Sequence, residues 1–134
     1  MRWRIGLIMV SILATASGSL EARQKFPPDK FANLQIFPKD TSPGVVINAM
    51  KGFTRALGVR CQFCHVGEEG LPLEKFDFVA DAKPEKQTAR MMIRMVGEIN
   101  GQITKAMPDA PAEGYQVTCF TCHRGAQHPQ HAPQ

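Results

Sequence analysis

Two copies of one short pattern constrain this chain more than any other feature of its sequence. All four cysteines of the 134 residues fall in the stretches CQFCH and CFTCH, which begin at Cys61 and Cys119. In each stretch a histidine directly follows the second cysteine. Valine precedes and glycine follows at matching positions, over 59–67 and 117–125. The tail of the chain therefore repeats the pattern of its middle, which predicts two repeated units.

Covalent attachment of haem needs this combination of residues. Two thiols form thioether links to the porphyrin vinyl groups, and the adjacent imidazole binds the iron from one face. A gap of two residues lets one tight turn present all three groups. The sequence therefore predicts two covalently bound haem c groups, held by Cys61, Cys64 and His65 in the first motif and by Cys119, Cys122 and His123 in the second.

Three other uses of paired cysteines fit less well. A zinc ribbon also has two Cys-x-x-Cys pairs, but it does not require a histidine after each pair. A disulfide within Cys-x-x-Cys closes too small a loop to add much stability. A thioredoxin-like redox pair would need alternating strands and helices around it, and the sequence does not predict them.

The N-terminus carries the marks of an export signal. The stretch MRWRIGLIMVSILATASGSLEA opens with two arginines, continues with an apolar run and ends in small residues, which is typical of a secretory signal peptide. The apolar run is shorter than the roughly 20 residues of a membrane-spanning helix. We predict a signal peptide over 1–22 with cleavage near Ala22, and an uncleaved anchor is the alternative. The expected location is periplasmic, with an uncleaved anchor or a partner complex as the route to membrane association.

The remainder is long enough for one domain. We predict a dihaem cytochrome c domain over 23–125 and a disordered tail over 126–134, where proline, glutamine and histidine dominate. The formal net charge of +4 is mildly basic. Nucleic acid binding would need a denser basic stripe interleaved with aromatic residues, so no nucleic acid partner is expected.

Helical signals precede each motif, so the predicted fold is mostly α. The prolines over residues 23–39 and the absence of sustained periodicity predict an extended arm that lies over the domain. A helix is expected over 43–57, with Ser42 as cap, proline at its first turn and Gly58 as its left-handed stop. A connection with Phe76 and Phe78 turned inward should follow the first motif. The apolar stripe of the first helix is Val46, Met50, Phe53 and Leu57.

A second helix is expected to begin at Pro84 and to bend or end near Asn100, because Gly97 and Gly101 weaken it. Its apolar stripe is Ala89, Met92, Val96, Ile99 and Ile103, with Arg90, Arg94 and Glu98 predicted on the opposite side.

Methionines on these stripes are the candidate sixth ligands of the irons. Met50 lies on the inward face of the first helix, where it either fills the core or is the sixth ligand of the first haem iron. For the second haem we favour Met92, in the centre of its stripe, over Met95 at the edge and Met91 towards the polar side. The histidines of the tail, His128 and His131, could bind iron but are more simply solvated residues.

Four stretches carry a resemblance to a known family: NLQIFPKD, LGVRCQFCHVG, TARMMIRMVGEIN and VTCFTCHRG. Together they cover roughly 33–125, and they resemble the cytochrome c subunit of photosynthetic reaction centres. In that family, repeated helix-turn-CxxCH units each hold one haem. The resemblance implies a methionine of the preceding helix as sixth ligand, which falls on Met50 and on Met92. The familiar members carry four haem motifs and this chain has two, so it looks like one half of such a subunit.

The predicted function is that of an exported dihaem electron carrier, donating to a photosynthetic or respiratory acceptor. Iron that is coordinated by histidine on one face and methionine on the other has no open position for a substrate, so no catalytic residues and no small-molecule substrate are expected. The expected partners are redox proteins. The alternatives are a small dihaem peroxidase or sensor with one open iron, and a structural module of a larger haem complex. Four basic residues lie near the first motif in sequence: Lys39, Lys51, Arg55 and Arg60. Three roles are open for them: pairing with the haem propionates, simple solvation, or docking of an acidic partner.

Overall fold

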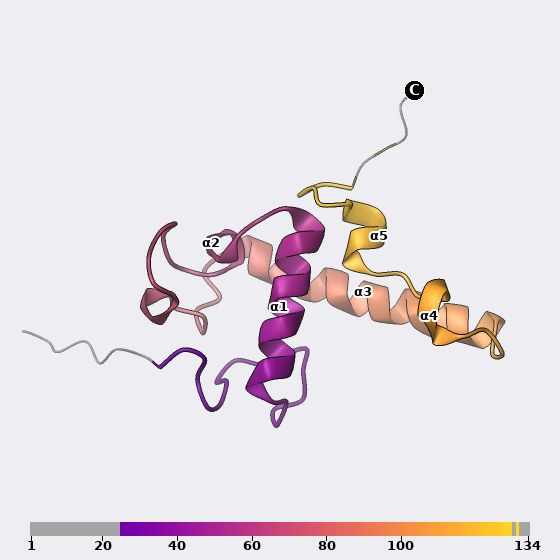
Figure 1. Cartoon of the computed structure of the whole chain (residues 1–134), viewed down its shortest axis with the longest axis horizontal. Helices are drawn as coiled ribbons and strands as arrows, with labels where there is room; N and C mark the ends of the chain where they lie inside the picture. The colour runs from indigo at the N-terminus through magenta and orange to yellow at the C-terminus, as the bar shows by residue number, and fades with distance from the viewer. Residues whose placement is uncertain (1–24, 130, 132–134) are drawn as a thin grey trace, which may run out of the picture.

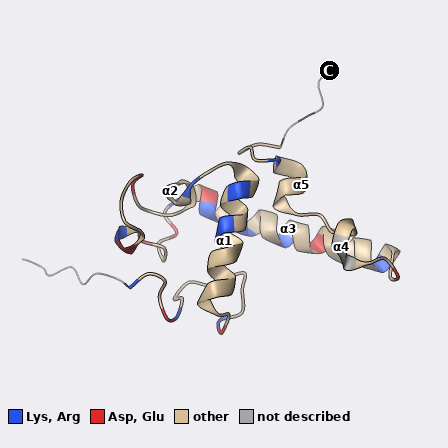
Figure 2. Ribbon diagram, in the orientation of Figure 1, with Lys and Arg blue, Asp and Glu red and all other residues tan. Residues whose placement is uncertain are grey.

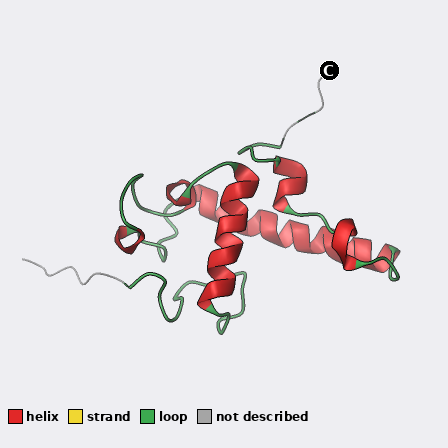
Figure 3. Cartoon of the chain, viewed as in Figure 1, coloured by secondary structure: helices red, strands yellow, loops and turns green. Residues whose placement is uncertain are grey.

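The computed structural model describes residues 25–129 and residue 131. The predicted signal peptide over 1–22 and part of the predicted tail lie outside the described residues. Helices make up the regular structure, and no β-strand occurs in the described part (Figures 1 and 3), which confirms a mostly α fold. The elements are α1 (Pro43–Leu57), α2 (Cys61–Cys64), the 3₁₀ turn η1 (Leu73–Lys75), α3 (Pro84–Ala106), α4 (Ala112–Tyr115) and α5 (Cys119–His123).

Helix α1 has the bounds that its local signals predict. Pro43 occupies the first turn, and Gly58 ends the helix in the left-handed conformation, with φ 66° and ψ 27°. Ser42 stands at the N-cap position, but its side chain makes no capping hydrogen bond, so the expected capping contact is wrong. Val46 of the predicted stripe is buried, and the rest of the stripe is half-buried.

Helix α3 runs unbroken for 23 residues, so of the two expectations, a bend or an end near Asn100, the end is wrong. Each glycine costs about 1 kcal/mol relative to alanine in a helix, which is too little to interrupt a helix fastened by tertiary contacts. Asn100 supplies one such contact: its side-chain amide donates to the Val117 carbonyl at 2.9 Å, and the Val117 N–H donates to Asn100 Oδ1 at 2.8 Å. The residue expected to end the helix instead holds the segment that enters the second motif.

The polar face of α3 differs from the predicted one. The predicted apolar stripe is half-buried along its whole length. Arg90, which was expected on the solvent side with Arg94 and Glu98, is instead buried, and so is Lys86 one turn before it. The reason lies outside the helix, because Asp81 of the preceding loop forms ion pairs with both cations.

The two repeated units are packed across each other. Helix α1 packs against α5, which carries the second motif, and α2, which carries the first motif, packs against α3 (Figure 1). At the first of these contacts the Gly125 N–H donates to the Ala56 carbonyl at 2.9 Å. Each long helix therefore contacts the motif of the other unit.

The hydrophobic core is small. Three hydrophobic side chains are buried among the residues that the structure describes: Val46, Ala56 and Phe76. Phe78 stacks on Phe76 at 5.6 Å and on Phe26 of the N-terminal arm at 5.1 Å, so the expected inward turn of Phe76 and Phe78 is confirmed. No helix in the described ranges is long and apolar enough to cross a membrane.

Candidate haem-binding sites

The first motif is one helical turn. In α2, Cys61 and Cys64 are three residues apart and therefore lie on one side of the turn. The His65 N–H donates to the Cys61 carbonyl at 2.9 Å, after which the chain continues extended. Both thiols are free and half-buried, and burial raises the pKa of Cys64, so its thiol stays protonated at neutral pH.

His65 is held as a neutral imidazole. Burial, followed by the nearby cations Lys86 and Arg90, lowers the pKa of His65 to about 4. Its ring meets the edge of Phe78 with a centroid separation of 4.9 Å, and its buried Nδ1 has no hydrogen-bond partner. A metal ligand must be neutral imidazole, and His65 meets this condition at pH 7 through its protein surroundings alone.

The second motif is a slightly longer turn with a different anchor. Thr118 and Thr121 form a capping box at the start of α5, with the Thr118 N–H donating to Thr121 Oγ1 at 2.9 Å. Arg124 ends the turn in the left-handed conformation. Cys119 is half-buried and burial raises its pKa, whereas Cys122 is exposed.

His123 has the partner that His65 lacks. Its Nδ1 lies 3.1 Å from the Ala126 carbonyl oxygen. A carbonyl only accepts, so this contact favours the tautomer with the proton on Nδ1 and leaves the Nε2 lone pair free for a metal. Both motifs therefore combine two free thiols with an imidazole, which is the donor set that covalent haem requires.

Three large hydrophobic residues in or before the second motif are exposed. Phe120, within the motif, has 56% of its surface exposed, and Tyr115 and Met107 nearby in the sequence are exposed as well.

The candidate methionines differ in burial. Met50 of α1 and Met92 of α3 are half-buried. Met91 and Met95 have exposed fractions of 58% and 44%. The tail histidines His128 and His131 are exposed.

The two cysteine pairs do not meet in one site. Over the described ranges, no three side chains of His, Cys, Asp or Glu converge as a metal ion would require. This arrangement differs from the joint four-ligand site of a zinc ribbon.

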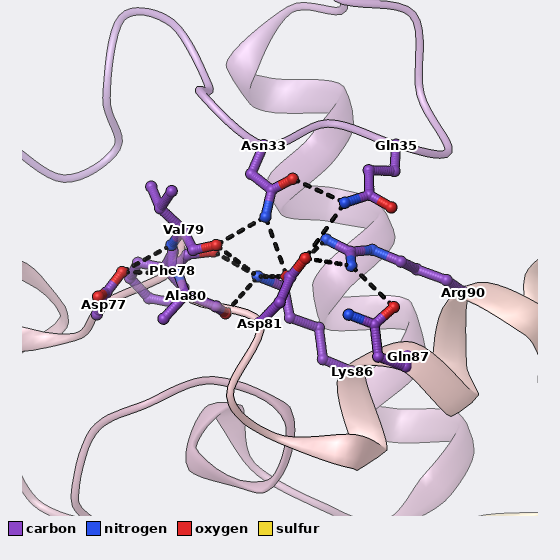
Figure 4. A network of polar contacts seen from close by, with 10 residues as sticks. All are labelled: Asn33, Gln35, Asp77, Phe78, Val79, Ala80, Asp81, Lys86, Gln87 and Arg90. Carbon is purple, nitrogen blue, oxygen red and sulfur yellow. Dashed lines mark hydrogen bonds and ion pairs between the residues drawn. The ribbon is translucent and has the colours of Figure 1, made fainter.

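A polar network around Asp81, in which Lys86 and Arg90 are buried, was missed by the sequence reasoning (Figure 4). Lys86 Nζ donates to the carbonyls of Phe78, Val79 and Ala80 at 3.0, 3.2 and 2.7 Å, and it pairs with Asp81 at 2.8 Å. Arg90 binds both oxygens of Asp81 at 2.8 and 2.9 Å. The only signal in the sequence is that Lys86 and Arg90 lie four residues apart.

The N-terminal arm completes this network. Asn33 donates to an Asp81 oxygen at 3.0 Å and to the Val79 carbonyl at 2.7 Å, and Gln35 donates to the other Asp81 oxygen at 3.2 Å. The hydrogen bonds from Arg90 and then Lys86 hold the pKa of Asp81 well below its usual range. The arm therefore lies over the domain, as its sequence predicts.

Exposed basic residues lie near the first motif. Lys and Arg colour the C-terminal half of α1 in Figure 2, where Lys51 and Arg55 are exposed. Arg60 forms an ion pair with Glu69 at 3.5 Å, in which both side chains are largely solvated. Solvated ion pairs of this kind contribute little to stability.

Comparison with known proteins identifies the family. The family model described as the photosynthetic reaction centre cytochrome C subunit matches residues 46–132, which include most of α1 and both motifs. The chain belongs to this family. Membership of a cytochrome c family implies covalently bound haem c.

Two curated relatives show how much of the family this chain represents. Cytochrome c-554 of Chloroflexus aurantiacus is 30% identical over 103 residues, which are 77% of this chain and 22% of that protein. The photosynthetic reaction center cytochrome c subunit of Rubrivivax gelatinosus is 31% identical over 93 residues, which are 63% of this chain and 24% of that protein. The chain thus spans about a quarter of the length of these two relatives. No solved structure matches.

Proposed function

We propose that this protein is an exported dihaem c-type cytochrome that carries electrons between redox proteins. The observation that carries the proposal is the pair of CxxCH turns, each with two free thiols and a histidine, in a chain whose own hydrophobic core is small. Haem c supplies an iron that cycles between two oxidation states. The proposed acceptor is a membrane reaction centre or a respiratory complex.

Attachment would use the four thiols. Cys61, Cys64, Cys119 and Cys122 would each add across a porphyrin vinyl group, with a new S–C bond formed and the thiol proton passing to the neighbouring vinyl carbon. This addition needs no oxidant. The free state of all four cysteines supports it.

The axial ligands would come from the motifs and from the two long helices. His65 and His123 would bind iron on one face, with the His123 Nδ1 proton held by the Ala126 carbonyl. Met50 and Met92 would close the other face, because a thioether sulfur suits an electron-transfer haem. Partial burial of Met92 supports it over the exposed Met91 and Met95. With both faces closed, no catalytic residue and no small-molecule substrate are proposed.

The haem count and the iron spectrum of the purified protein test this proposal. Pyridine haemochrome should give two haems per chain. The near-infrared band from sulfur-to-iron charge transfer should have two-haem strength in the oxidised protein. Met50→Leu and Met92→Leu should each remove half of this band, while the matched control Met91→Leu should leave it intact.

Other results would change the conclusion. A band of one-haem strength in the native protein, together with azide binding at one iron, would favour the peroxidase or sensor alternative. A chain that is exported but holds no haem would overturn the proposal.

A further inference from the structure

The two histidines that follow the motifs stand in different electrostatic surroundings. The His65 ring packs against Phe78, the Phe78 carbonyl accepts a hydrogen bond from Lys86, and Lys86 and Arg90 both form ion pairs with Asp81. The side chains of Lys86 and Arg90 are only 9% and 8% exposed, so water and salt screen them weakly. The first motif therefore faces an excess of buried positive charge.

This charge is held in place by the fold. Lys86 is fixed by three loop carbonyls, and Arg90 binds Asp81 through two hydrogen bonds. Lys83 donates to the Gln62 carbonyl inside the first motif. Asp77 and Glu85 are the acidic residues nearest to this cluster in sequence, and Glu68 and Glu69 follow the first motif, where Glu69 forms an ion pair with Arg60. Asp77 is exposed and accepts hydrogen bonds from the Val79 and Ala80 N–H groups. The negative charge of Glu85 raises the pKa of the Cys64 thiol.

The ring nitrogens give a second, independent difference. His123 Nδ1 lies 3.1 Å from a carbonyl oxygen, whereas the buried His65 Nδ1 has no partner. A hydrogen bond from Nδ1 to an acceptor makes the opposite nitrogen a stronger electron donor to a metal. A stronger donor stabilises oxidised iron and lowers its reduction potential.

Both differences act in the same direction. Oxidation adds one positive charge to a haem, so nearby buried cations oppose oxidation and raise the reduction potential. The weaker donor at His65 has the same effect. We propose that the cluster of Lys86, Arg90 and Asp81 makes the haem of the first motif the higher-potential centre. An electron that enters at the second haem then collects at the first.

This inference rests on the proposed dihaem function and adds an internal direction of electron flow. Lys86 and Arg90 are positioning residues in this scheme: they do not ligate the iron and act on it through their charge. Asp81 moderates their effect, because it contributes the one negative charge of the cluster. The scheme therefore predicts shifts of opposite sign for removal of a cation and removal of the carboxylate.

The test is a redox titration of the holoprotein with the two haems resolved. NMR signals of the two ligand imidazoles, assigned to His65 and His123, report how far each haem is reduced at each potential. At half reduction of the native protein, the first haem should be more reduced than the second. Lys86→Met should lower the potential of the first haem, and Asp81→Asn should raise it. The exposed control Lys105→Met should change neither haem.

Each outcome decides the inference. Equal or reversed order of the two haems in the native protein overturns it, even if neither variant folds. If Lys86→Met and Asp81→Asn shift the reduction potential of the first haem in the same direction, the inference is also overturned, because a general destabilisation of the fold would shift the potential alike in both variants. A haem count other than two overturns the proposed function itself, whereas two haems in reversed order overturn only the direction of flow.

Discussion

Replacement of Gly58 by alanine tests the contact that holds the two units together. Gly58 ends α1 with φ 66°, a conformation that costs a residue with a side chain about 1 to 2 kcal/mol. A Cβ atom added there would stand 2.1 Å from the Gly125 carbonyl oxygen, which is a backbone atom, and the Cβ itself is fixed by the backbone of residue 58. Neither can move aside without a shift of α1 against the second motif.

The expected loss is the sum of two effects. Displacement of Gly125 breaks the hydrogen bond of its N–H to the Ala56 carbonyl, which is worth about 1 kcal/mol net. Together with the conformational cost, Gly58→Ala should destabilise the protein by about 2 to 3 kcal/mol.

Two other glycines provide matched controls. Gly70 also has a positive φ, 86°, but an added Cβ meets nothing within 4 Å. Gly70→Ala should therefore show only the conformational cost of about 1 to 2 kcal/mol. Gly97 lies inside α3 with open space around it, and Gly97→Ala should stabilise the protein by up to about 1 kcal/mol.

Urea unfolding of the holoprotein variants, followed by far-ultraviolet circular dichroism, measures these differences. The expected order of stability is Gly97→Ala, native, Gly70→Ala and then Gly58→Ala. If Gly58→Ala is no less stable than Gly70→Ala, the close approach to Gly125 has no energetic consequence and the reasoning is refuted.

Three further predictions concern the loop anchors and the cofactor. Asn100→Ala should cost about 1 to 3 kcal/mol because both backbone groups of Val117 lose their partner. Asn48→Ala at an exposed site of α1 should leave the urea midpoint unchanged or slightly raised, and equal midpoints for the two variants would contradict the role of Asn100. The pKa of Asp81 is lower in the folded chain than in the unfolded chain, so its ion pairs stabilise the protein above about pH 4 and are lost as the pH falls. Asp81→Asn should thus show a smaller loss of stability between pH 7 and pH 3 than the native protein, and parallel pH profiles would count against it. The chain produced without haem should show less helix by circular dichroism than the holoprotein, and native-like helix would disprove that expectation.

Local signals predicted α1 correctly because they act over a few residues. Proline at the first turn and a glycine stop at Gly58 sufficed for both bounds of the helix. The same kind of reasoning was wrong about the end of α3. The hydrogen bonds of Asn100 reach a segment 17 residues further along the chain, and no local pattern records them.

The placement of Arg90 shows the same limit for charge. Periodicity placed it on the solvent side with Arg94 and Glu98, since an unpaired guanidinium avoids burial. The partner that permits its burial, Asp81, comes from a loop whose sequence has no helical period. The assignments of Met50 and Met92 as sixth ligands stay predictions.

The sequence by itself determined the chemistry of the two motifs, because Cys-x-x-Cys-His needs only neighbouring residues to present two thiols and an imidazole on one turn. It also determined the mostly α fold class, through the spacing of apolar residues along two helices. Only the tertiary structure decided how the two motifs differ. His65 lies beside buried cations and His123 beside a carbonyl oxygen, in motifs whose cysteine and histidine spacing is the same. Charge and hydrogen bonding act through space, so groups distant in the chain set the surroundings of each histidine.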